Sequence, residues 1–98
     1  YRSANSLQRL GSEYRRKREE APVEAEKLAR QLCAARGAAV SEWGFGYSLM
    51  LQNLMDSNQA CLDAADMAEA RGSTAEASAL RDPVLRAWAN ADSGWAVD

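Results

Sequence analysis

The sequence contains no histidine and no isoleucine, and it has only two cysteines, two prolines and one phenylalanine. Without histidine, the chain lacks the commonest general base and the commonest protein ligand of transition metals. Cys33 and Cys61 do not form a Cys-x-x-Cys spacing, so no zinc site is recognisable. These absences predict a protein that is not an enzyme and that has no cofactor and no metal site.

Long hydrophobic runs are also missing. No stretch approaches the roughly 18 to 20 apolar residues of a membrane span, and no secretory signal peptide is recognisable. The chain begins at Tyr1 without a methionine, which indicates a cleaved precursor or numbering that starts inside a longer protein. On the first interpretation we expect a mitochondrial or plastid protein that has lost its targeting segment. Attachment to the surface of a membrane complex stays open.

What the sequence has in abundance is alanine, within an apolar fraction of 47%. Alanine has the highest helix propensity but the least apolar surface to bury. We therefore expect helices around a small core, which a partner surface would complete. A chain of 98 residues forms one domain at most.

Helix breakers divide the chain into segments of helical periodicity, and no strand pattern is found. Pro22 suits a first helical position, Gly72 a C-terminal cap, and Ser73 to Glu76 a capping box. Asp82 and Pro83 together predict the start of another short helix. We expect helices over 3–20, 22–36, 47–71 and 74–81, and a short one from residue 82 onward.

The predicted fold is therefore all-α. It is a small bundle of three main helices, followed by two short C-terminal helices and an extended tail. A single domain over 1–98 would contain an arginine-rich helix (1–21), a central helical hairpin (22–72) and the short helices with the tail (73–98). We expect a core built around Leu28, Leu32, Leu51, Leu54, Cys61 and Leu62.

Three expectations concern individual side chains. Cys33 and Cys61 lie on apolar helical stripes and are expected to be buried and reduced, with a disulfide as the alternative. Val23 is placed on the buried stripe of the second helix, and Trp88 on a buried stripe with Val84 and Leu85. Asp63 and Asp66 are three residues apart and could share a cation, but the simpler interpretation is a solvated face.

The most conspicuous charged stretch is EYRRKREE, from Glu13 to Glu20. Consecutive basic residues point around a helix at about 100° intervals and form no single stripe. Neighbouring acids offset them, with Glu13–Lys17 and Arg15–Glu19 as the expected i,i+4 pairs. The net charge of −2 also argues against general nucleic-acid binding. A solvated or partner-facing helix is the favoured interpretation, with RNA or anionic lipid as alternatives.

Aromatic and arginine side chains, which are enriched at protein interfaces, supply the candidate partner-binding residues. Several aromatics lie in a glycine-containing stretch or in the tail, where a partner could bury them. The alternative is that Trp43 and Phe45 cover the protein's own core. The candidates are Trp43, Phe45, Tyr47, Trp95, Arg15, Arg16 and Arg18.

Two short patterns resemble known families. Arg-Gly pairs end two helical segments 35 residues apart, at Gly37 and Gly72, and the tetratricopeptide repeat has a period near 34. The small-residue and helix-start positions of that repeat resemble a set around the second pair, namely Ala65, Ala68, Gly72, Glu76 and Ala77. Ordinary C-capping explains the same pairs, because the first is followed by the aromatic stretch and not by a capped helix. Trp43 and Gly44 resemble the central turn of small secreted helical hairpins, although the glycine spacing is off by one and Pro22 interrupts the first arm. Both resemblances imply an interaction protein.

The sequence thus predicts a non-catalytic helical subunit or adaptor that stabilises a larger assembly of other protein subunits. The alternatives are a module that binds RNA or anionic lipid through Arg15 to Arg18, and an interaction protein of the tetratricopeptide or secreted-hairpin kind.

Overall fold

The computed structural model describes residues 4–37 and 47–90, without the side chains of residues 4, 5, 47–50 and 90. Four helices and no strand are found in this part, which confirms the all-α class. They are α1 (Ala4–Glu20), α2 (Pro22–Ala34), α4 (Tyr47–Ala70) and α5 (Thr74–Asn90).

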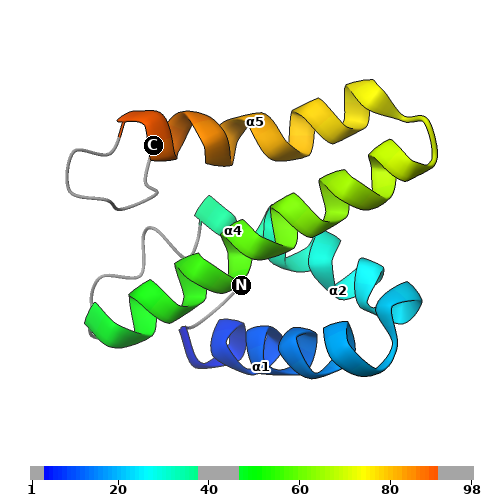
Figure 1. Cartoon of the computed structure of the whole chain (residues 1–98). Coiled ribbons are helices and arrows are strands. Elements are labelled where there is room, and N and C mark those ends of the chain that lie inside the picture. Colours follow the sequence, from blue (N-terminus) through cyan, green and yellow to red (C-terminus); the bar gives the residue numbers. More distant parts are fainter. Residues whose placement is uncertain (1–3, 38–46, 91–98) are drawn as a thin grey trace.

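The long helix α4 is the centre of the structure. It packs against α1, α2 and α5, and Figure 1 shows it between α5 on one side and the α1–α2 pair on the other. Successive helices run in opposite directions, so α1 and α4 run the same way. Side chains of α4 therefore contact three neighbours and determine how they are placed.

Local signals explain where the helices begin and end. Pro22 is at the start of α2 and lacks only an N–H that a first helical turn leaves unbonded. Gly72 has φ 83°, in the left-handed region that glycine adopts without strain. The amide of Gly72 bonds to Glu69 O at 2.9 Å and that of Ser73 to Ala68 O at 2.9 Å, which is a Schellman motif. The predicted glycine cap at the end of α4 is confirmed.

The C-terminal region differs from the prediction. One continuous helix, α5, replaces the two short helices, and Pro83 lies inside it. A proline inside a helix removes one backbone hydrogen bond and disfavours helical geometry in the residue before it. Neither effect makes it impossible for the helix to continue. Here Ala77 lies before the proline and Val84 and Ala87 after it, and all three are buried. Packing on both sides of Pro83 therefore overrides the local signal.

The continuity of α5 also explains why the prediction for Trp88 was wrong. Ala77, Val84 and Ala87 are buried and Leu80 is partly buried, so the buried stripe follows the spacing 77, 80, 84, 87. Trp88 lies beside this stripe and is 47% exposed, and Leu85 is also exposed. The prediction started a new helix at Pro83, so it did not use Ala77 and Leu80, which show where the buried stripe of the continuous helix lies.

The core is small and rich in alanine, as predicted. Of the six expected core residues, Leu32, Leu54 and Cys61 are buried, whereas Leu28, Leu51 and Leu62 are only partly so. Val23 was misplaced, since it is 89% exposed. The largest cluster of buried residues joins α1, α2 and α4 through Leu7, Tyr14, Ala25, Ala29, Leu32, Ala35, Ala60 and Ala64.

Candidate interaction surface

The contact between α1 and α4 requires a glycine. A Cβ atom added at Gly11 would overlap the carboxylate of Asp56, and Gly11 itself is buried. The missing side chain lets the backbone of α1 approach α4 closely. This approach brings the arginines of α1 within reach of the carboxylates of α4.

Two clusters of similar composition lie along this contact. In the Asp56 cluster, Gln52 donates to Asp56 Oδ1 at 3.2 Å and the Arg15 guanidinium pairs with Oδ2. The Asp63 cluster repeats this pattern two helical turns later. There Gln59 donates to Asp63 Oδ1 at 2.9 Å, and Arg18 Nε lies 2.8 Å from Asp63 Oδ2. Asp56 and Asp63 therefore each receive an amide from one turn earlier and a guanidinium from α1.

Tyr14 adds a buried member to the second cluster. Its ring is in the core and its hydroxyl donates to Asp63 Oδ2. Burial of the phenol, the hydrogen bond and the nearby carboxylate charge together raise the pKa of Tyr14 above its usual value. The hydroxyl consequently remains a donor to the Asp63 carboxylate up to a higher pH than a free tyrosine would.

A pocket of about 220 Å³ opens between these two clusters. Met55 lies between the glutamines on α4 and is 63% exposed, although most large apolar side chains of described residues are buried or partly buried. The surface therefore combines an apolar centre with a hydrogen-bonding rim, which is the composition of many protein–protein contacts. The lining residues are Tyr14, Arg15, Arg18, Gln52, Met55, Asp56 and Gln59.

All four basic residues of the charged stretch make ion pairs, but not the expected ones. Arg15 and Arg18 reach across to α4, and Arg16 pairs with Glu20 at 3.2 Å. Lys17 pairs with Glu24 of α2 at 3.2 Å and not with Glu13. The expected Glu13–Lys17 and Arg15–Glu19 pairs give way because tertiary contacts bring other carboxylates closer.

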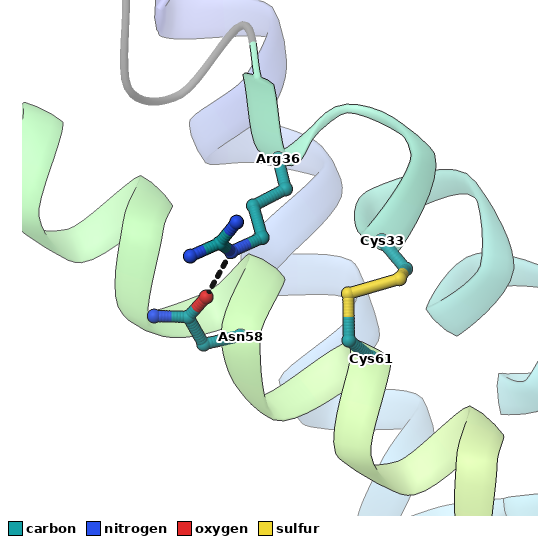
Figure 2. The surroundings of a disulfide bond; sticks show 4 residues. All are labelled: Cys33, Arg36, Asn58 and Cys61. Carbon is teal, nitrogen blue, oxygen red and sulfur yellow. Dashed lines mark hydrogen bonds between the residues drawn. A yellow bond between two sulfur atoms is a disulfide. The ribbon is translucent and has the colours of Figure 1, made fainter. Parts of the chain in front are cut away.

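The prediction that both cysteines are reduced was wrong. Cys33 of α2 and Cys61 of α4 form a disulfide, with their Cα atoms 4.7 Å apart. Figure 2 shows the disulfide beside a second link between the same regions, in which Arg36 Nε donates to Asn58 Oδ1 at 2.6 Å. Each cysteine does lie on an inward stripe, and the packing of α2 on α4 puts the two stripes face to face.

Near the C-terminal end of α4, two arginines and two glutamates form a network of ion pairs. Arg30 of α2 contacts Glu26 at 3.1 Å and Glu76 at 2.9 Å, and Arg71 contacts Glu26 at 3.0 Å and Glu76 at 3.5 Å. The neighbouring guanidiniums, Arg30 above all, lower the pKa of Glu76. The expected capping box is not formed, because Glu76 binds the arginines and the Ser73 amide belongs to the Schellman motif.

Asp63 and Asp66 do not share a site. Asp63 faces α1, whereas Asp66 pairs with Arg81 of α5 at 3.0 Å. Among the described residues no group of three or more metal-ligating side chains is close enough to hold a metal ion.

The aromatic candidates remain untested. Trp43, Phe45 and Trp95 lie outside the described residues, and so does the side chain of Tyr47, the first residue of α4. Of the candidate arginines, Arg15 and Arg18 line the pocket, and Arg16 does not. Sequence reasoning missed Met55 and both glutamines, although the repeat of Gln and Asp four residues apart, at 52/56 and 59/63, was visible in the sequence.

Comparisons with known proteins add no assignment. No family model matches the chain, and neither a curated protein nor a solved structure matches it. Within residues 4–37 and 47–90, no helix is long and apolar enough to cross a membrane.

Proposed function

We propose that this chain is a non-catalytic helical subunit or adaptor that binds another protein through the α1–α4 surface. The observation that carries the proposal is Met55, a 63% exposed apolar side chain beside a pocket with a polar rim. Methionine adapts to irregular partner surfaces, and arginine is enriched where proteins bind each other. The chain has no histidine, and both of its thiols are joined in a disulfide, which also favours a non-catalytic role.

Two further features suit a subunit. The core consists largely of alanines, which bury little apolar area each, so a partner surface would add stability that the chain has in short supply. The Asp56 and Asp63 clusters hold α1 on α4 through the hydrogen bonds that Tyr14, Arg15 and Arg18 donate to the two carboxylates. The surface around Met55 is thereby organised before a partner binds, which lowers the entropic cost of association.

The test is purification of the chain from its native source by size-exclusion chromatography under non-denaturing conditions. We expect it to elute with a complex well above its own 10.7 kDa. A Met55→Gln variant, which keeps helix propensity but removes the apolar contact, should shift to the monomer fraction.

The matched control is Val23→Gln, because Val23 is also an exposed apolar side chain but lies on α2, away from the pocket. This variant should stay in the complex. Recovery of the wild-type chain only as a free monomer would contradict the proposed function.

A further inference from the structure

In the Asp56 and Asp63 clusters the arginine side chains are exposed and the aspartate side chains are largely buried. The side chains of Asp56 and Asp63 are 6% and 14% exposed, whereas those of Arg15 and Arg18 are 46% and 47% exposed. The carboxylates thus lie beneath the guanidiniums. A molecule that approaches the pocket meets the outer edges of two arginines first.

The arginines retain hydrogen-bonding capacity. A guanidinium has five N–H donors; Arg15 uses some of them on Asp56 and Ser12, and Arg18 uses some on Asp63. The remaining donors suit a carboxylate, which accepts from the guanidinium fork with charge-assisted hydrogen bonds. The internal pairs at the same time hold both guanidiniums in place.

The pocket between them suits one apolar side chain. Its volume of about 220 Å³ is below the roughly 300 to 1,000 Å³ of sites for drug-sized ligands. Met55 is the exposed apolar residue of its lining, and Gln52, Gln59 and the buried Tyr14 border it. An anchor of leucine or phenylalanine size would find apolar contact inside and polar groups at the rim.

Polyanions fit this surface less well than a peptide does. Nucleic acids and anionic membranes depend on a net excess of cations that releases counterions or meets a surface potential. Here the two exposed arginines are balanced by two carboxylates, and the whole chain has a net charge of −2. A ligand that combines apolar burial with one or two local carboxylates depends much less on net charge.

We infer that the α1–α4 pocket takes an acidic segment of a partner protein, with an apolar side chain beside Met55 and carboxylates on the outer edges of Arg15 and Arg18. This inference rests on the proposed function and specifies the partner's chemistry. The acidic segment would bind in addition to the internal Asp56 and Asp63 pairs and would not replace them.

The experiment uses the full oxidised chain, labelled with 15N and with 13C at the methionine methyls. The probe is a capped tetrapeptide with two leucines between two glutamates. We expect saturable shifts of the Met55 methyl and of the Gln52 and Gln59 side-chain amides, with a dissociation constant on the order of 1 mM. The matched peptide with lysines in place of the glutamates should bind at least about tenfold more weakly, which corresponds to about 1.4 kcal/mol.

Variants separate the contribution of the apolar contact at Met55 from that of the arginine charge. Met55→Gln and Arg18→Gln should each weaken the acidic peptide by about tenfold, while Arg18→Lys retains part of the affinity and Val23→Gln retains all of it. Thermal unfolding of each variant checks that the fold persists. If Arg18→Gln fails to fold, the comparison of acidic and basic peptides on the wild-type chain still decides the question.

Several results would overturn the inference: equal binding of both peptides, no saturable shift, or tighter binding of a single-stranded RNA oligonucleotide or phosphatidylserine vesicles at the same residues. These outcomes are distinct from failure of the proposed function. If Met55→Gln releases the chain from its native complex but the acidic peptide does not bind, only the partner's chemistry is wrong.

Discussion

The two halves of α4 bury side chains of different chemistry. Among the described side chains of residues 51–58, the buried ones are Leu54 and four polar residues, namely Asn53, Asp56, Ser57 and Asn58. Beyond Cys61 the buried positions are alanines, Ala64, Ala65 and Ala68, and none of them is exposed at all. One helix thus presents a polar interior at one end and an alanine interior at the other.

The difference matters because burial has opposite consequences for the two kinds of side chain. A buried polar group loses its hydration, and this loss is offset only if a protein partner replaces the water. Asp56 and Asn58 have such partners in Arg15 and Arg36, whereas the Ser57 hydroxyl has none. The buried alanines of the other half need no hydrogen-bond partners and allow close approach, so their contribution to stability depends on shape.

The comparison teaches that polar side chains of α4 orient α1, whereas its buried alanines provide close packing. Ion pairs along both halves select one register of α1 against α4, since Arg15 pairs with Asp56 before Cys61 and Arg18 pairs with Asp63 after it. The alanine half contributes close packing with α2 and α5. Cys61 lies between the halves and joins them covalently to α2.

The largest expected effect comes from removing the link at the boundary, with Cys33→Ala and Cys61→Ala combined. A disulfide that closes a loop of 28 residues restricts the unfolded chain by about 3 to 4 kcal/mol in the chain-entropy model. Urea unfolding followed by circular dichroism should show a midpoint about 1 to 3 M lower than for the oxidised wild type. Reduced wild type is the control and should behave like the double variant; an unchanged midpoint in both would show that the disulfide does not support the fold.

The next effect is in the polar half. Asn58→Ala removes the acceptor 2.6 Å from Arg36 Nε and should lower the free energy of unfolding by about 2 kcal/mol, since the arginine is buried and charged. Asn58→Asp keeps an acceptor and should cost clearly less. Equal losses for the two variants in urea titrations would mean that the Arg36 contact is not what stabilises this position.

In the alanine half, stability should depend on the volume of the buried side chains. Ala64→Leu inserts a larger side chain where no surface is exposed and should destabilise the protein by about 1 to 3 kcal/mol through overpacking. Ala70→Leu, at an exposed position of the same helix, is the control and should change stability by no more than about 0.5 kcal/mol. Calorimetric melting temperatures give the comparison, and tolerance of Ala64→Leu would show that the helices can separate at this end.

The smallest effect has the opposite sign. Ser57→Ala removes a buried hydroxyl that lacks a hydrogen-bond partner, so stability should stay equal or rise by up to about 1 kcal/mol. The exposed Ser78→Ala on α5 isolates the gain in helix propensity, which is at most about 0.7 kcal/mol. A rise for Ser57→Ala beyond that of Ser78→Ala confirms the cost of the buried hydroxyl. A drop of more than about 0.5 kcal/mol would mean that the hydroxyl is bonded in solution.

Much of α4 could be predicted from the sequence. Its four–three spacing puts Leu51, Leu54, Asn58, Cys61, Ala65 and Ala68 on one seam, and all of these are buried except Leu51, which is partly buried. Its end was predicted from Gly72. Such features follow from residues within one or two turns of each other, where helical geometry alone determines the neighbours.

The candidate site was only half predictable. Arg15 and Arg18 were identified as partner-binding candidates from residue type, but their carboxylates lie 41 and 45 positions away in the chain. Met55 was not among the expected partner-binding residues, because periodicity does not show which neighbour covers a given side of a helix. The exposure of Trp88 was missed because Pro83 predicted the start of a new helix, so the buried stripe was assigned without the residues before the proline.

The sequence by itself determined the helical class, the strong tendency toward a small alanine core and the positions at which α2 begins and α4 ends. These depend on propensity, proline and glycine geometry, which act locally. Tertiary structure alone decided the Cys33–Cys61 bond, the pairing of Arg15 and Arg18 with α4 and the passage of α5 through Pro83. Each of these depends on which helix faces close together in space, and that choice is made by the packing energy of the whole chain and not by any local stretch.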